Sequence, residues 1–143
     1  MTNRATLEAL LARVLEGTGP DRELDAEIGA AVRALPSSAV GLGVVGWLQR
    51  WEGPFMTDPA LPGHILTENR INWKAPPYTA SLDAALTLVP EGWHAETGIR
   101  KNWSWARLFK SSLLPATDII RALTPARALI AACLKARMEA QND

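Results

Sequence analysis

Hydrophobic side chains recur with a helical period near the start of the chain. In residues 6–16, leucine or valine returns every three or four positions until glycines interrupt the pattern. The predicted inward residues of this first helix are Leu7, Leu10, Leu11, Val14 and Leu15. A second helix is predicted between Pro20, which suits a first helical position, and Pro36, which ends it. Its predicted inward residues are Leu24, Ile28, Ala31, Val32 and Leu35.

The pattern loosens in the middle of the chain. Residues 39–52 contain three glycines, which weaken a helix, together with valines and tryptophans, which favour strands, so we predict a strand. The spacing of Trp47 and Trp51 also fits a helix. Residues 55–63 read as a loop because of their prolines and glycine, and the alternation in 69–75 predicts a short half-exposed strand.

Helical periodicity returns in two later segments. In "YTASLDAALTLVP", Thr79 or Ser81 is the predicted N-cap and Pro90 the stop, with Leu82, Ala85, Leu86 and Val89 inward. Near the end, Thr124 is the predicted N-cap and Pro125 the first residue of an alanine-rich helix. Its predicted inward residues are Ala126, Leu129, Ile130 and Cys133.

Between these helices, "GWHAETGIRKNWSWARLFK" predicts a β-hairpin. Trp93 lies on the first arm, residues 98–102 form the turn, and the second arm alternates Trp103, Trp105, Arg107 and Phe109. The following "SSLLPATDIIRAL" reads as irregular.

The predicted order is α–α–(β–β)–α–β–β–α, without a recurring repeat. Helices combined with a small, mainly antiparallel sheet indicate the α+β class and a layered α/β/α sandwich. The length of 143 residues predicts a single domain spanning 1–143.

Composition narrows the function classes. Lysine and arginine balance aspartate and glutamate, so the formal net charge is zero and a simple polyanion binder is not indicated. The charges are unevenly distributed, however: residues 16–27 contain five acidic residues and one arginine, and residues 100–137 contain eight basic residues and one aspartate. The basic segment could steer an acidic partner, or the two segments could neutralise each other within the fold or between subunits. No apolar run is long enough for a membrane span, and one cysteine permits no internal disulfide, so we predict a soluble protein of the cytoplasm.

The stretch "GLGVVGW", Gly41 to Trp47, matches the G-x-G-x-x-G signature of dinucleotide-binding folds. That signature needs a buried strand before it and a crossover helix after it. Here a helix and a polar bridge precede the glycines, and Gly53-Pro54 follows too soon for a crossover helix. We therefore predict a glycine loop and no nucleotide cofactor.

Catalytic and metal-binding patterns are equally weak. The two histidines, His64 and His94, could combine with Glu68 or Glu96, but at no recognised ligand spacing. No serine lies in a G-x-S-x-G elbow, and Cys133 falls on an apolar helix stripe, where a thiol is normally inert. Asp21, Glu23, Asp25 and Glu27 read as a helix start and its solvated face. The sequence thus predicts no metal, no cofactor and no enzyme.

The sequence is rich in tryptophan. All six tryptophans lie between residues 47 and 105, interleaved with arginine and lysine. Such rings can cover the core of a thin sheet, form a protein interface, or stack on bases. Trp103 and Trp105 would project from one face of a strand. The predicted binding residues are Trp103, Trp105, Arg100, Lys101 and Arg107.

Three blocks resemble the phage ABA sandwich domain, a family of small phage and prophage proteins. They are "PPYTASLDAALTLVPEGW", "TGPDRELDAEIGAAV" before it and "TPARALIAACLKAR" after it, in the same order as in the family. The segments 36–77 and 97–123 match poorly. The resemblance implies a layered sandwich fold and a phage accessory gene, and it assigns no catalytic residues.

The leading hypothesis is therefore a non-enzymatic phage or prophage protein that binds a host protein or protein complex, for example to inhibit a host defence system. A second hypothesis is a sponge for a nucleotide messenger, with arginines on phosphates and tryptophans on bases. A third is a small hydrolase built on His64 or His94. The leucine-rich first helix and the charge polarity are also compatible with a homo-oligomer.

Overall fold

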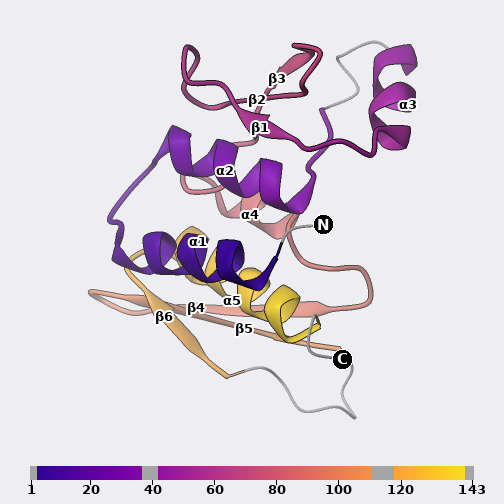
Figure 1. The fold of residues 1–143 in the computed structure, drawn as a ribbon. Helices are drawn as coiled ribbons and strands as arrows, with labels where there is room; N and C mark the ends of the chain where they lie inside the picture. Colours follow the sequence, from indigo (N-terminus) through magenta and orange to yellow (C-terminus); the bar gives the residue numbers. More distant parts are fainter. Residues whose placement is uncertain (1–2, 37–41, 111–117, 141–143) are drawn as a thin grey trace. The chain divides into compact units, whose positions relative to one another are not determined.

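The computed structural model describes residues 3–36, 42–110 and 118–140 and divides into two compact units. The first unit comprises residues 1–21 and 77–143, and the second comprises 22–76. Each combines helices with a three-stranded antiparallel sheet (Figure 1). The predicted α+β class with antiparallel pairing is confirmed, and the strands form two sheets.

The first unit is organised around its C-terminal helix. It contains α1 (Arg4–Glu16), α4 (Leu82–Leu86), β4 (His94–Ile99), β5 (Ser104–Phe109), β6 (Ile120–Ala122) and α5 (Pro125–Ala140). Helix α5 contacts α1, α4 and all three strands, which lie in the order β4-β5-β6. Every residue from 126 to 134 is buried, because helices and sheet enclose α5. Helix α5 is therefore the hydrophobic core of this unit.

The helix ends of this unit follow the sequence signals. The side chain of Thr124 accepts a hydrogen bond from the Arg127 N–H, and α5 begins at Pro125, as predicted. The Ser81 side chain caps α4 at the Ala84 N–H. The predicted inward residues of α5 are all buried, whereas Leu86 of α4 is exposed. Helix α4 has five residues and ends at Leu86, so the predicted spacing of inward residues does not extend to that leucine.

A buried arginine joins α1 to α5. The guanidinium of Arg127 donates to the carbonyls of Arg13 (3.3 Å) and Val14 (3.0 Å) at the end of α1 and to the carbonyl of Gly19. The carbonyls of Arg13 and Val14 belong to the last turn of α1, at the negative end of the helix dipole, where a cation is favourable. Gly17 leaves the space that this guanidinium fills, since a Cβ there would overlap it.

The second unit contains α2 (Arg22–Val32), α3 (Leu42–Arg50), β1 (Met56–Thr57), β2 (His64–Leu66) and β3 (Asn72–Lys74). The strands pair in the order β1-β2-β3, and α2 contacts β1 and β2. The predicted strand in 69–75 is confirmed as β3, with Trp73 buried between exposed neighbours. The expected loop at 55–63 contains the short strand β1, and β2 follows it.

The predicted strand at 39–52 is wrong for its described part, which is the helix α3. Residues 37–41, including Gly41, lie outside the described part of the chain. Trp47 and Trp51, four positions apart, stack with ring centroids separated by 4.9 Å. Side-chain stacking at helical spacing thus outweighs the low helix propensity of glycine and valine.

The sequence suggested that Asp25 lies on a solvated helix face, and the structure contradicts this. Its side chain is fully buried on α2 and forms an ion pair with Arg22 at 2.8 Å. The same guanidinium donates to the carbonyls of Gly63 (3.4 Å) and Ala75 (2.7 Å). This arginine thereby fastens the segments that flank β2 and β3 to the start of α2.

Candidate functional site

The predicted hairpin is present as β4 and β5. The strands pair antiparallel from His94 opposite Phe109 to Ile99 opposite Ser104. Along β5, buried residues alternate with half-buried ones, and the buried set faces α5. The half-buried set therefore projects from the sheet face opposite α5.

We call this surface the hairpin face. It comprises Trp103, Trp105, Arg107 and Phe109 from β5 and the residue before it, His94 and Glu96 from β4, and Arg121 from β6. Cross-strand neighbours project to the same side of a sheet, so the register places these side chains together.

Specific contacts fix the side chains of the hairpin face. The Arg107 guanidinium forms an ion pair with the Glu96 carboxylate across the strands, at 3.0 Å. The Arg121 guanidinium lies 4.5 Å from the centre of the Trp103 ring. His94 contacts Phe109 with ring centroids 5.5 Å apart. These contacts hold the rings of Trp103 and Phe109 in one arrangement.

Gly98 gives the Trp105 ring its position. It lies directly opposite Trp105 in the register, and a Cβ at Gly98 would overlap the indole. The absence of a side chain lets the ring cover the backbone of β4. The sequence placed this glycine in the turn; it is instead in β4, before the turn.

The five predicted binding residues divide into two groups. Trp103, Trp105 and Arg107 share the hairpin face. Arg100 and Lys101 are exposed at the end of the hairpin, where the Arg100 N–H donates to the Trp103 carbonyl at 2.8 Å. They add positive charge to the rim of the hairpin face.

Sequence reasoning missed the third strand and its contribution. Arg121, on β6, lies opposite Trp105 in the register. Ile119 and Leu123 flank this strand and are 53 % and 49 % exposed. They alternate with the inward Ile120 and Ala122, so they extend the outward side with apolar area. In the sequence this segment reads IIRAL, in which Arg121 is the one polar residue, so the outward positions of Ile119 and Leu123 could not be recognised without the pairing of β6 with β5.

In comparisons with protein families, curated proteins and solved structures, no match to this chain was found. The resemblance to the phage ABA sandwich family stays a prediction.

The remaining tryptophans serve other purposes. In the second unit, Trp73 is buried, meets Phe55 edge-on with ring centroids 4.9 Å apart, and donates from Nε1 to the Ala34 carbonyl. Trp47 and Trp51 pack against the same core. These rings are structural, whereas Trp93, before β4, lies beneath the Lys110 ammonium at 5.4 Å.

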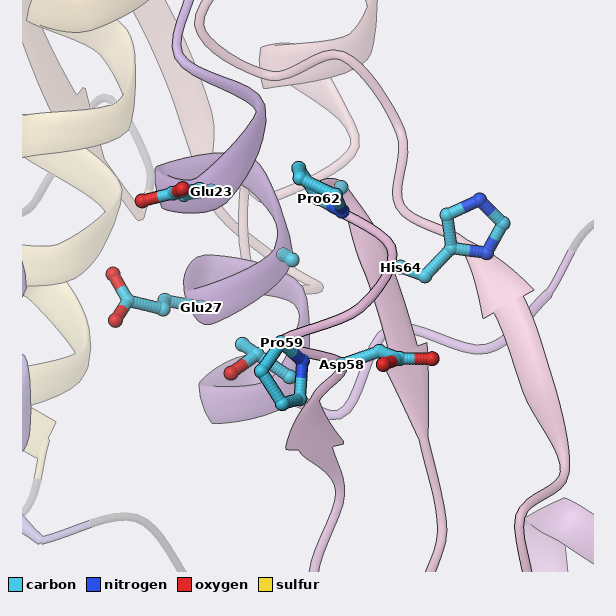
Figure 2. Close-up of a pocket in the computed structure, with 9 residues that line it drawn as sticks. Glu23, Glu27, Asp58, Pro59, Pro62 and His64 are labelled. Atoms are coloured by element: carbon cyan, nitrogen blue, oxygen red, sulfur yellow. The ribbon is translucent and has the colours of Figure 1, made fainter.

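The second unit also contains a cavity of about 270 Å³, between α2 and the segment that joins β1 to β2. Glu23 and Glu27 line it from α2, and Asp58 and His64 line it from the other side. Figure 2 shows the two glutamates pointing to one side and the His64 ring pointing to the opposite side. The acids and the imidazole therefore do not converge on one point.

His64 is instead tied to polar neighbours. Its Nδ1 lies 2.6 Å from Oδ1 of Asn72, whose Nδ2 donates to Asp58 at 3.0 Å. This pattern places the hydrogen on Nδ1 of the imidazole, because the amide oxygen can only accept. The chain of hydrogen bonds connects β3 to the segment after β1 and orients the ring.

Other candidate chemistry is absent from the described residues. Within 3–36, 42–110 and 118–140, no three histidine, cysteine or acidic side chains are grouped to hold a metal ion. Burial raises the pKa of the Cys133 thiol to about 12, so the reactive thiolate is disfavoured. No helix in these ranges is long and apolar enough to cross a bilayer.

Proposed function

We propose that this protein acts by binding an acidic surface of another protein through the hairpin face, and that it performs no reaction of its own. The observation that carries the proposal is the group of half-buried aromatic and cationic side chains on the sheet face opposite α5. Tryptophan and arginine are the side chains that most often dominate the energetics of protein interfaces.

The charge of the surface indicates the chemistry of the partner. Arg107 and Arg121 lie on the hairpin face, with Arg100 and Lys101 at its rim. Among the residues that define the hairpin face, Glu96 is the single carboxylate, and Arg107 neutralises it. A complementary partner would therefore be acidic, and its association would weaken as salt is added.

Order within the surface supports binding as well. The ion pair at Arg107 and the ring contact at Arg121 hold these side chains in one arrangement. A surface that is ordered in advance loses less conformational entropy when it binds.

The origin of the partner follows from the resemblance alone. A phage or prophage accessory protein would meet its partner in the cytoplasm of the host, and a host defence complex would be a fitting target. A nucleotide messenger is the alternative ligand. The position of Arg121 over the Trp103 ring favours a protein, because a stacking base would have to displace the guanidinium from that ring.

The experiment has two stages. The tagged protein is used to purify partners from the natural host, and each partner is then purified and titrated directly. The double variant Trp103→Ala/Trp105→Ala and the variant Arg121→Glu should lose affinity by about 100-fold or more, as expected for interface hot spots. The matched control, Lys74→Glu, reverses an exposed charge on β3 and should bind like the wild type.

Circular dichroism and thermal melting of each variant separate lost binding from lost folding. If the double variant is unfolded, its tryptophans belong to the core and the proposal is wrong. If Arg121→Glu folds and binds every purified partner with wild-type affinity, the hairpin face is not the contact surface. A rise in melting temperature with a cyclic nucleotide would favour the messenger alternative, since a ligand of the native state must stabilise it.

A further inference from the structure

Strand β4 has one unpaired edge in the described part of the chain. In the order β4-β5-β6, β4 pairs only with β5. Its sequence, His94–Ile99, contains no proline or lysine, the residues that commonly protect an edge from pairing with another chain. An edge of this kind can accept a further strand.

The hydrogen bond that closes the hairpin identifies the free backbone groups. The N–H of Arg100 donates to the carbonyl of Trp103, so the backbone of Arg100 points toward β5. Backbone direction alternates along a strand, and the pairing of β4 with β5 is regular. The N–H and C=O groups of Ala95, Thr97 and Ile99 therefore point to the open edge. The side chain of Ile99 is 72 % exposed there.

We propose that β4 pairs antiparallel with β4 of a second copy of this chain, with Thr97 opposite Thr97, so that one continuous sheet runs through the dimer. The proposal concerns the edge of the sheet and does not rest on the proposed binding function of its face. Each facing pair whose backbone points outward would exchange two hydrogen bonds. Thr97 would pair with its own copy, and Ala95 with Ile99 in both directions.

Charge selects this register over the one centred on Glu96, and backbone pairing selects it over the one centred on Gly98, in which Ala95 would face Lys101 beyond the end of β4. A two-fold pairing keeps each face of the sheet continuous, so even-numbered residues must face even-numbered residues and odd-numbered residues must face odd-numbered ones. The neighbouring register would centre on Glu96 and oppose two carboxylates, which is unfavourable. Centring on Thr97 instead sets Glu96 against Gly98, which has no side chain, and brings Arg100 diagonally near Glu96 of the second copy. The exposed Ile99 gains an apolar neighbour in Ala95. The edge thus complements itself.

Cysteine cross-linking tests the register. The Cα atoms of a facing hydrogen-bonded pair lie about 5.5 Å apart, within the range of about 4.4–6.8 Å that a disulfide spans. Thr97→Cys should therefore form a covalent dimer on mild oxidation, and Ala95→Cys, which keeps Glu96 and lies far from its own copy in this register, should form far less. Native Cys133 is fully buried and does not compete. Equal cross-linking of both variants, as a register centred on Glu96 would give, or preferential cross-linking of Ala95→Cys, would overturn the register.

Sedimentation tests the dimer itself. The wild type should shift from monomer to dimer as its concentration rises. Thr97→Lys should stay monomeric, because two ammonium groups would face each other in the dimer. It should keep the fold, because no backbone hydrogen bond between β4 and β5 uses Thr97. Thr18→Lys, which makes the same change at an exposed loop position, should dimerise like the wild type. A wild type that remains monomeric, or a folded Thr97→Lys that still dimerises, would refute the proposal. Neither result affects partner binding by the hairpin face.

Discussion

Replacing Arg127 by methionine tests whether one buried cation holds α1 against α5. Arg127 is 2 % exposed, and methionine keeps much of its aliphatic volume while removing the charge. Its guanidinium donates to the carbonyls of Arg13, Val14 and Gly19. No carboxylate within the described ranges pairs with it, so these carbonyls must offset the loss of its hydration.

The magnitude follows from those bonds. A hydrogen bond to a charged group contributes about 1.5–3 kcal/mol, and the variant loses four of them, two to the Gly19 carbonyl and one each to Arg13 and Val14. The variant recovers part of this sum because no charge needs to be desolvated. We therefore expect Arg127→Met to lower the free energy of unfolding by about 2–4 kcal/mol, a large share of the roughly 5–15 kcal/mol of a typical domain.

Urea unfolding followed by tryptophan fluorescence measures this change. The control is Arg100→Met, which removes an exposed arginine and should alter the free energy of unfolding by less than about 0.5 kcal/mol. A loss in Arg127→Met as small as that of the control would refute the reasoning, since the guanidinium would then contribute nothing that methionine cannot replace.

Three further predictions concern buried side chains and the space around them. Gly17→Ala should destabilise the wild type by about 1–3 kcal/mol through overlap with the guanidinium, and by clearly less in the Arg127→Met background; additive losses in a double-mutant cycle would contradict this. Asp25→Ala should cost about 3 kcal/mol because it leaves Arg22 without its buried partner, whereas the exposed Glu23→Ala should be nearly neutral in the same urea assay. The Cys133 thiol should resist a thiol reagent in the native protein at pH 8 and react after unfolding. Its pKa is about 12 in the folded state, against an ordinary value of 9.0, so its contribution to the free energy of unfolding is full below pH 9 and is lost as the pH rises toward 12. The variant Cys133→Ala should lack this pH dependence.

Local signals explain how much of the fold the sequence could predict. Thr124 and Pro125 mark the start of α5 because capping and proline chemistry act within a few residues. The alternation from Trp103 to Phe109 predicts β5 because one face of the strand packs on α5 and the other does not. Such features depend on neighbours close in the chain, which the sequence displays.

Features that depend on distant residues could not be predicted in this way. Helix α3 carries four glycines and valines in succession, at 43–46, and Trp47 stacks on Trp51, the residue directly after the helix. The burial of Asp25 depends on Arg22, whose other partners lie at Gly63 and Ala75. For the candidate site, the hairpin residues were predictable, whereas Arg121 required the pairing of β6 with β5.

The size of the side chains on the two faces of β5 supports the binding role proposed for the hairpin face. Toward α5, β5 presents Ser104, Ala106 and Leu108, and the buried face of α5 is rich in alanine, so the two backbones can approach closely. Toward α5, β5 thus contributes one large apolar side chain, Leu108, and two small residues. The largest rings of the strand, Trp103 and Trp105, project to the other face, where their large apolar area adds little to that core. A strand whose stability were its whole role would have the opposite arrangement, with aromatic rings inward and small or polar residues outward. Because the rings project away from α5 and are fixed there by Gly98 and Arg121, their placement supports the proposal that the hairpin face contacts a partner.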